Sequence, residues 1–239
     1  MDPELPVDPT SVFIASVPGR EENLRVVIKS LYDQADGIFI YLDGYTSIPA
    51  WLSEFPKTSS QIGFFLGDGG KFIGHQKGYN LTVDDDLFYP STYVEDLVRV
   101  INAHNRKAVV SYHGKILTQY PVSSYYRDPS IMKLMCLEEV RMTRRVHIVG
   151  TGAMGYHSDT IRFRAFDFPV RNMADLWASK RCIEKGVEMV CAKHRAGYIR
   201  HQEIDFSKTI YERFKDSDEE QTRIVNEMLQ NSFEGDGFQ

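Results

Sequence analysis

Strand-like and helix-like segments alternate near the N-terminus, and few folds accommodate that order. Residues 12–17 (VFIASV) form a short apolar run rich in β-forming residues, which stops at Pro18-Gly19. Residues 38–42 (IFIYL) form a second such run, and between the two runs apolar residues recur at helical spacing at Leu24, Val27, Ile28 and Leu31. A helix between two buried strands is typical of a βαβ unit with parallel strands. The sequence therefore predicts an α/β fold with a parallel sheet.

The same alternation continues along the chain. Three more strands are predicted, at residues 62–66, 79–83 and 108–112. A clear amphipathic helix is predicted at 91–104, and Thr92-x-x-Glu95 near its start matches a capping box. Later, the pattern predicts a helix at 173–185 closed by Gly186, a strand at 187–192 and an amphipathic C-terminal helix from about Ser217.

The middle of the chain has no clear period. Residues 113–145 are expected to form a long loop or a loosely structured insertion, and long loops in compact domains are often functional. We expect the basic run at 141–145 to be a solvated surface, with contact to an anionic acceptor as the alternative. Glycine-rich residues 150–155 follow a short apolar run; no helix is expected directly after them, and a dinucleotide fingerprint requires one.

Length and composition exclude several classes of protein. With 239 residues, 42% of them hydrophobic, the chain can bury one substantial core, so a single domain is expected. The net charge of −5 and the pI of about 5.8 give no basic field, so nucleic acid is not an expected partner. The three cysteines lack CxxC spacing, which argues against a disulfide framework or a thiolate zinc site. No signal peptide and no membrane span are recognised, so we expect a soluble, cytoplasmic protein.

Three consecutive aspartates, Asp84, Asp85 and Asp86, follow the strand predicted at 79–83. They would fill a strand-to-helix corner at the carboxyl end of a central strand, where open α/β sheets bind ligands. A hydrated turn would explain one or two of them, because aspartate is common in turns and helix caps. Three adjacent like charges at a partly dry edge instead favour a bound cation, and hard carboxylate oxygens suit Mg²⁺ or Mn²⁺. We expect a divalent metal here, with a turn as the alternative.

Three other segments should end at the same edge of the sheet. Two of them close the first and second strands, and the third is the glycine-rich turn GDGGKF, which carries one acid and one base. As a bare turn it would need no ligand. Its place just before the aspartates instead suggests that its lysine meets a phosphate and that its backbone N–H groups approach a ligand. The candidate residues of these segments are Ser16, Pro18, Arg20, Asp43, Asp68, Gly70 and Lys71.

The chain resembles glycosyltransferases of the GT-A fold in the order of six segments: ASVPGREENLRVVIKSLYDQADGIFIYLDGY, LGDGGKF, YNLTVDDDLFYPSTYVEDL, SYHGKIL, IVGTGAMGYHSDTI and FPVRNMADLWAS. The resemblance spans residues 12–199, and its strongest element is the DxD-type acidic motif followed by Tyr89-Pro90. The closest in style are family-2-like enzymes that build capsular polysaccharide or viral capsid glycans. The resemblance implies a GT-A (Rossmann-like), mostly parallel central sheet flanked by helices in a single domain.

In such enzymes the DxD motif binds a divalent metal that holds the diphosphate of a nucleotide sugar. The resemblance implies that Asp86, with Asp84, ligates Mn²⁺ or Mg²⁺, that Asp84 also faces the ribose or sugar, and that Asp85 belongs to the same donor site. The metal would stabilise the charge of the departing diphosphate. The rest of the nucleotide site would comprise Ser16, Pro18, Arg20, Asp43, Asp68, Gly70 and Lys71.

The resemblance also points to Asp175 as the general base that takes the proton of the acceptor hydroxyl. Without it, an acid in the first turn of a helix is explained by the helix dipole. Some members of the fold add a late histidine to the metal, but nothing local selects among His113, His194 and His201. Residues 150–152 resemble a loop that cradles the donor or acceptor.

The expected function is transfer of a sugar by a metal-dependent, inverting hexosyltransferase from a UDP-sugar to a glycan or other hydroxyl acceptor. A sugar-phosphate nucleotidyltransferase stays open, although that class opens with a longer glycine-rich phosphate loop than Ser16–Arg20. A non-catalytic nucleotide- or glycan-binding module, as one domain of a longer chain, is the third reading. The expected boundaries are a tail at 1–11, a GT-A domain at 12–206 divided near residue 112 into nucleotide and acceptor halves, and a helical segment at 207–239.

Overall fold

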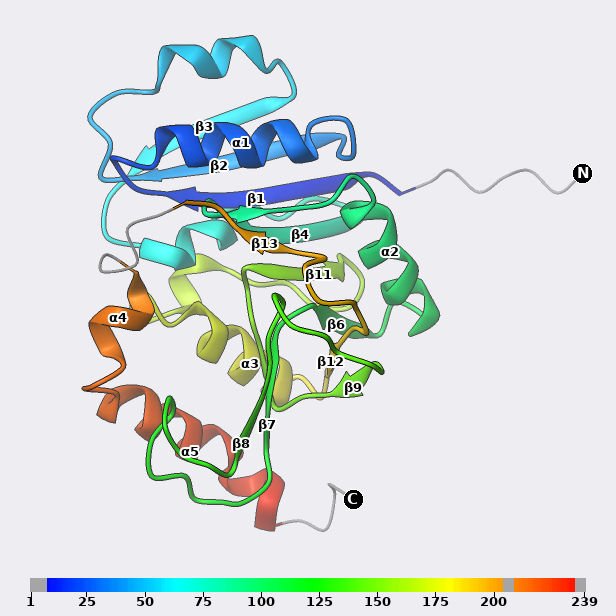
Figure 1. Cartoon of the computed structure of the whole chain (residues 1–239), viewed down its shortest axis with the longest axis vertical. Helices are drawn as coiled ribbons and strands as arrows, with labels where there is room; N and C mark the ends of the chain where they lie inside the picture. The colour runs from blue at the N-terminus through cyan, green and yellow to red at the C-terminus, as the bar shows by residue number, and fades with distance from the viewer. Residues whose placement is uncertain (1–7, 204–208, 235–239) are drawn as a thin grey trace, which may run out of the picture.

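The computed structural model describes residues 8–203 and 209–234, and Figure 1 shows their arrangement. The first βαβ unit is present: β1 (Thr10–Ser16) lies parallel to β2 (Gly37–Asp43), and α1 (Glu21–Leu31) connects them. β3 (Thr58–Gly63) pairs in parallel with β2, and β4 (Tyr79–Asp84) pairs in parallel with β1. The α/β fold with a mostly parallel central sheet is therefore confirmed.

A large sheet organises the molecule. Its order is β3-β2-β1-β4-β11-β6-β12-β9. β6 (Ala108–Ser111) and β12 (Glu188–Cys191) form a second parallel pair, and β9 (Arg144–Arg145) lies antiparallel to β12. β11 (Ala153–His157) joins the two halves because it pairs antiparallel with both β4 and β6. The last residues of β1, β2, β4 and β6 and the first residue of β11 consequently lie at one edge of the sheet, which we call the carboxyl edge.

Helices cover both faces of this sheet. α1 and α2 (Tyr93–Ala103) pack in one core with alternate strand residues such as Ala108 and Val110. α3 (Ala174–Glu184) packs in a second core that contains Val109, the residue between them. The two-residue period of a strand thus divides one apolar run between two cores. This explains why the strands appear in the sequence as continuous apolar runs.

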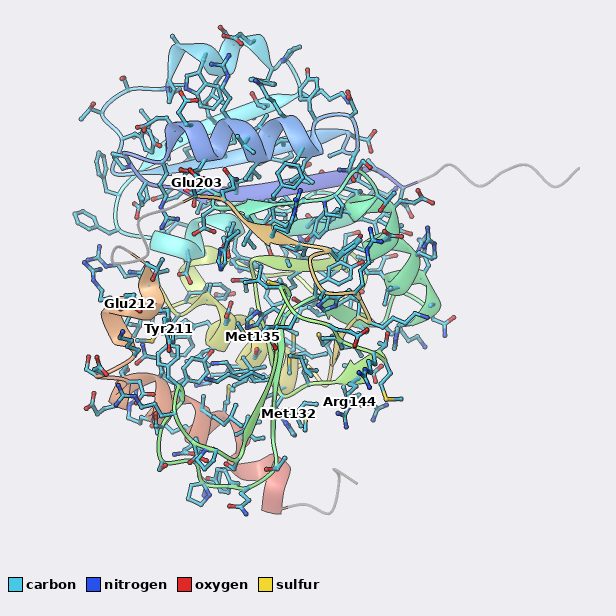
Figure 2. The ribbon with its side chains drawn as sticks, in the orientation of Figure 1. Met132, Met135, Arg144, Glu203, Tyr211 and Glu212 are labelled. Atoms are coloured by element: carbon cyan, nitrogen blue, oxygen red, sulfur yellow. The ribbon has the colours of Figure 1, made fainter. Side chains whose placement is uncertain are left out.

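Residues 113–145 are more ordered than the sequence suggested. β7 (Gly114–Leu117) pairs antiparallel with β8 (Ile131–Leu134) and with β10 (Ile148–Val149), so the predicted long loop is wrong for this part. These strands are short, and too few residues define their period. Arg144 and Met132 (both labelled in Figure 2) connect β9 to β8, with Nη1 lying 3.5 Å from Sδ.

Short elements complete the described chain. β5 (Leu87–Phe88) pairs with β13 (Arg200–His201), beside the three aspartates. The 3-10 helices are η1 (Ala50–Glu54), η2 (Gly67–Phe72) and η3 (Ala165–Asp167), and α4 (Ile210–Phe214) precedes α5 (Glu219–Glu234). α5 confirms the predicted C-terminal helix, and Figure 1 shows it below α3, against which it packs.

Two local predictions are wrong. The strand expected at 62–66 is β3 and ends at Gly63, because Phe65 has a φ of 75°, a left-handed conformation that no strand contains. The capping box is not formed, since Thr92 Oγ1 donates to Asp96 rather than bonding the helix backbone. Residues 150–152 form a loop between β10 and β11, and the rest of the glycine-rich segment belongs to β11.

Candidate functional site

Several polar segments meet at the carboxyl edge. Ser16 ends β1, Asp43 ends β2, and Asp84 ends β4. η2 passes the same edge, and α3 begins there at Ala174. Because parallel strands end on one side of a sheet, segments far apart in the sequence are brought together here. The structure brings most of the candidate residues together at this edge, where several of them contact one another.

Asp85 and Asp86 are held by Arg20. Nη1 of Arg20 donates to Asp85 Oδ1 at 2.7 Å and to Asp86 Oδ2 at 3.1 Å, and Ser16 Oγ donates to Asp85 Oδ2 at 2.6 Å. Burial raises the pKa of Asp85 despite these partners. Burial also raises the pKa of Asp86, to about 7, and the charges of Asp84 and Asp85 add to the shift. The aspartate cluster therefore carries more negative charge than its one arginine compensates. Pro18, at the turn before Arg20, is exposed.

Lys71 supplies the second cation of the cluster. Its side chain is 3% exposed and its Nζ donates to Asp84 Oδ1. Burial by itself lowers the pKa of Lys71, but Asp84 and Asp68 together hold it above its ordinary value. A buried lysine needs such partners, since an unpaired buried charge is costly. The buried Lys71 thus neutralises the charge of Asp84 from inside the protein. The side chain of Asp84 is itself 40% exposed.

Asp43 and Asp68 hold η2 in place. Asp43 Oδ2 accepts from the backbone N–H of Gly67, and Asp68 Oδ2 accepts from that of Ala174. In the described part of the chain, Oδ1 of each aspartate is buried without a hydrogen-bond partner. Burial raises the pKa of Asp68 to about 6. Two unpartnered carboxylate oxygens beside one edge could accept hydrogen bonds from hydroxyl or N–H groups of a ligand.

Gly70 has a packing role that its place in a glycine-rich turn did not reveal. A Cβ at this position would lie 2.1 Å from Cδ1 of Tyr41. The glycine therefore lets η2 lie directly on the Tyr41 ring. The group that its backbone approaches closely is thus a side chain of the protein itself. Whether a ligand also approaches Gly70 stays a prediction.

Asp175 and Asp84 are joined through the loop before β11. Thr151 donates from its backbone N–H, at 2.7 Å, and from Oγ1, at 2.8 Å, to Oδ1 of Asp175. The next residue, Gly152, accepts from the Asp84 backbone N–H, and a Cβ on it would lie 2.0 Å from Asp84 Oδ2. Two adjacent residues thus touch the end of β4 on one side and the start of α3 on the other. Thr151 and Gly152 were not recognised from the sequence as residues that fix two acids.

A lysine that the sequence analysis did not select lies beside Asp175. Lys115 on β7 is buried, and its Nζ lies 3.2 Å from the ring centroid of Tyr125 and 5.1 Å from that of Tyr126. Burial lowers the pKa of Lys115 to about 7, and the nearby charge of Asp175 opposes the shift. The segment SYHGKIL carries this lysine, but no local pattern distinguishes it from a surface charge.

The three candidate histidines occupy different places. Both ring nitrogens of His194 lie within hydrogen-bond distance of backbone carbonyl oxygens, those of Ala192 and Met135. His113 packs against Gly150, where a Cβ would lie 2.7 Å from the Cβ of His113; burial lowers its pKa, while Asp175 and Asp84 oppose the shift. His201 pairs with Leu87 across β13 and β5, and the Asp84 charge reaches it. The charge of Asp84 therefore acts on both His113 and His201. Neither histidine is shown to ligate a metal.

Asp84 and Asp86 are the carboxylates expected to bind a divalent ion, and their surroundings decide whether they can do so. Among the described residues, no group of three or more His, Cys, Asp or Glu side chains is arranged to hold a metal. Such ions, however, are commonly held by one or two carboxylates, with water and substrate phosphates as the other ligands. Asp84 and Asp86 each use one oxygen for Lys71 or Arg20, and no described group donates to Asp84 Oδ2 or Asp86 Oδ1. The residues therefore fit an ion that would share these two carboxylates with a diphosphate.

Comparison with known proteins identifies a fold. No family model and no curated protein matches the sequence. A solved structure of S. aureus TarS aligns with a TM-score of 0.50 and 13% identity over 94% of this chain and 43% of that chain. TarS 1–349 aligns with a TM-score of 0.49 and 15% identity over 95% of this chain and 72% of that chain. The complex of TarS 1–349 with UDP-GlcNAc gives 0.49 and 14%, over 95% and 73%.

This chain therefore spans less than half of the first of these TarS chains. At such identity the likeness shows the fold alone, and it supports the glycosyltransferase fold that the sequence predicted.

Proposed function

We propose that this chain is a metal-dependent hexosyltransferase that moves a sugar, with inversion, from a UDP-sugar to a hydroxyl group of a glycan acceptor. The observation that carries the proposal is the Thr151-Gly152 pair, which touches Asp175 through one residue and Asp84 through the next. A donor-binding acid and an acceptor-side base are thereby held at one edge of the sheet, as transfer between two bound substrates requires.

Asp84 and Asp86 are the residues that would hold Mn²⁺ or Mg²⁺. Lys71 pairs with Asp84, and Arg20 pairs with Asp86. When bound, the ion would supply positive charge to the diphosphate that leaves. Asp43 and Asp68, each with a buried oxygen that no described group satisfies, would accept hydrogen bonds from the nucleoside or sugar. Ser16 would orient Asp85, and Asp85 would fix Arg20.

Asp175 would take the proton of the acceptor hydroxyl. Thr151 holds Oδ1 with two hydrogen bonds, and no described group donates to Oδ2, which is free to accept the proton. As the proton leaves, the acceptor oxygen bonds the anomeric carbon from the side opposite the diphosphate. The bond from that carbon to the diphosphate oxygen breaks, UDP departs with the electron pair, and the configuration inverts.

The test separates donor binding from transfer. Asp175→Asn keeps the size of the side chain and its hydrogen bonds to Thr151, so UDP affinity, measured by calorimetry with and without Mn²⁺, should stay close to the parent's. Sugar transfer should fall by about 10²–10⁴-fold, since one positioned proton acceptor contributes this much. UDP-GlcNAc, the ligand of one solved TarS structure, is the first donor to try.

Asp167→Asn is the matched control, because Asp167 is an exposed acid in η3. It should leave both UDP binding and transfer unchanged. Full transfer by the Asp175→Asn variant would remove Asp175 from the mechanism. Mn²⁺-dependent UDP binding without any transfer by the parent protein would favour a binding module, and release of pyrophosphate from UTP and a sugar phosphate would favour a nucleotidyltransferase.

A further inference from the structure

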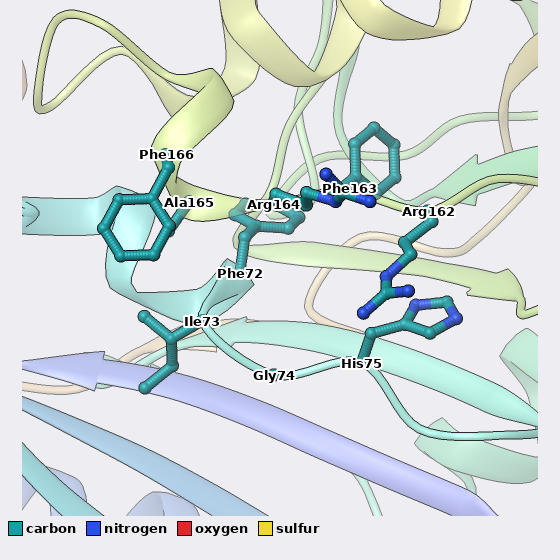
Figure 3. A pocket seen from close by; sticks show the side chains of 9 residues that line it. All are labelled: Phe72, Ile73, Gly74, His75, Arg162, Phe163, Arg164, Ala165 and Phe166. Carbon is teal, nitrogen blue, oxygen red and sulfur yellow. The ribbon is translucent and has the colours of Figure 1, made fainter.

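A pocket that none of the candidate carboxylates lines lies between two segments of the chain. Residues 72–75 start at the last residue of η2, and residues 162–166 lead into η3. The pocket has a volume of about 210 Å³, and Figure 3 shows it from close by. It is lined by Phe72, Ile73, Gly74, His75, Arg162, Phe163, Arg164, Ala165 and Phe166.

One end of this pocket is apolar. Ile73 and Phe166 lie there (Figure 3), and Phe166 is 89% exposed. The floor is aromatic, because the ring of Phe72 packs edge to face against those of Phe163 and Phe168, at centroid distances of 5.3 and 4.9 Å. An exposed phenylalanine above a rigid aromatic floor can cover a flat apolar group.

The other end is basic. The guanidinium of Arg162 lies beside the imidazole of His75 (Figure 3), and Arg164 lines the same pocket. Among the described residues neither arginine forms an ion pair, and no acid lines the pocket. Nδ1 of His75 is buried and has no hydrogen-bond partner in the described part of the chain. The arginines at the basic end thus have N–H donors for which no described residue is recorded as an acceptor, and an anion would accept from them.

A neighbouring pocket lacks the positive charge of the first one. It has the same volume and shares Ile73 and Gly74, but its other lining residues are uncharged: Phe39, Ile40, Ser59, Ser60 and Gln61. The same segment therefore borders one neutral pocket and one basic pocket. Only the basic one offers both an apolar surface and a place for a negative charge.

We propose that the pocket between residues 72–75 and 162–166 binds a small amphipathic anion, namely a carboxylate or phosphate on a compact aromatic or branched apolar body. The body lies between Ile73 and Phe166, and the anionic group lies between Arg162 and His75. A volume of about 210 Å³ is below the range typical of drug-sized ligands, so a whole nucleotide sugar does not fit. The pocket shares no lining residue with the candidate donor site, and the proposal does not depend on the proposed transfer.

Phenyl phosphate is the probe that tests both ends of the pocket. Binding is followed by NMR through the ring proton of His75 on Cε1, with inorganic phosphate and benzyl alcohol as probes of each end alone. Phenyl phosphate should bind about 10- to 100-fold more tightly than inorganic phosphate, since burying a phenyl group contributes this much. It should also raise the pKa of His75, which burial and Arg162 hold below its ordinary value, because a nearby anion favours the protonated ring.

Two variants and one control complete the test. Arg162→Gln and Phe166→Ser change exposed side chains, so the fold should persist, and each should weaken phenyl phosphate binding by about tenfold or more. Arg195→Gln, at an exposed arginine that does not line the pocket, should leave the affinity unchanged. Equal binding of phenyl and inorganic phosphate would overturn the apolar half of the proposal. Binding that survives Arg162→Gln, or no change at His75 with any probe, would overturn the site.

Discussion

At the scale of one residue, Gly152 leaves room for the side chain of Asp84. It lies opposite Asp84, and any Cβ there would reach within 2.0 Å of Asp84 Oδ2. We expect Gly152→Ala to displace this carboxylate, because a side chain end moves more easily than the backbone. Mn²⁺-dependent UDP binding, measured by calorimetry, should weaken by about 10- to 100-fold, as expected for a lost charged contact, while the melting temperature changes little.

Gly69→Ala is the control for this substitution. Gly69 lies in η2 near the same edge, and a Cβ there would lie 3.5 Å from Phe168, an ordinary contact distance. It should bind UDP as the parent does. A Gly152→Ala protein with parental affinity would show that the position of Asp84 does not matter for the donor.

A second prediction at the scale of one residue concerns Lys115 and the pH dependence of the free energy of unfolding. Its pKa is about 7 in the folded protein against an ordinary 10.5, so between these values the folded chain binds fewer protons at this site than the unfolded chain. The free energy of unfolding should therefore rise with pH from 7 upward, with a slope of at most about 1.4 kcal/mol per pH unit from this one group. Lys115→Met should be more stable than the parent at pH 7 and should lose this contribution to the slope.

Urea unfolding at pH 7, 8 and 9 measures the effect, and the difference between variant and parent removes the contribution of other groups. Lys77→Met, at an exposed lysine, should leave the pH dependence as it is. If the Lys115→Met protein shows the parental slope, Lys115 is charged in the folded state across this range.

At the scale of elements, α5 holds the loop that carries Tyr125 and Tyr126. Asp218, just before the helix, accepts from Ser124 and Tyr126, and Thr222 Oγ1 accepts from the Tyr125 N–H. One turn later, Asn226 bonds both the N–H and the C=O of Val122, each at 2.9 Å. These three side chains recur every four residues and so share one face of the helix. The loop over Lys115 is therefore fixed by the C-terminal part of the chain.

Asn226→Ala should loosen this loop. Two backbone groups of the buried residue Val122 would lose their partners, which should cost about 1–3 kcal/mol in the free energy of unfolding. Hydrogen exchange of the Val122 amide should accelerate, while that of β1 and β4 should follow only the global change in stability. Glu227→Ala alters the next residue, which is exposed, and should change stability by about 0.5 kcal/mol or less. Unchanged exchange at Val122 in the Asn226→Ala protein would contradict the role given to α5.

At the scale of the whole molecule, β11 decides where the two halves meet. It runs antiparallel between β4 and β6, so its first residue adjoins the ends of both strands, and the loop before it reaches Asp84 and Asp175 together. Three cores, one on each face of the sheet and one around α5, hold this arrangement. None of the described helices is both long enough and apolar enough to cross a membrane.

The local order of residues was sufficient to predict most of the parallel strands, the helices α1, α2, α3 and α5, and the edge of the sheet at which Asp43 and Asp84 both lie. Apolar periodicity is a short-range property, and parallel strands place their carboxyl ends together whatever the loops do. The partners of those residues depended on contacts between distant segments. Lys71 and Arg20 bind the aspartates from 13 and 65 positions away, and Gly152 leaves room for Asp84 from across β11. The burial that sets the pKa of Lys115, like the sheet formed by β7, β8 and β10, arises only when the whole chain packs, because no local pattern encodes which surfaces lose their water.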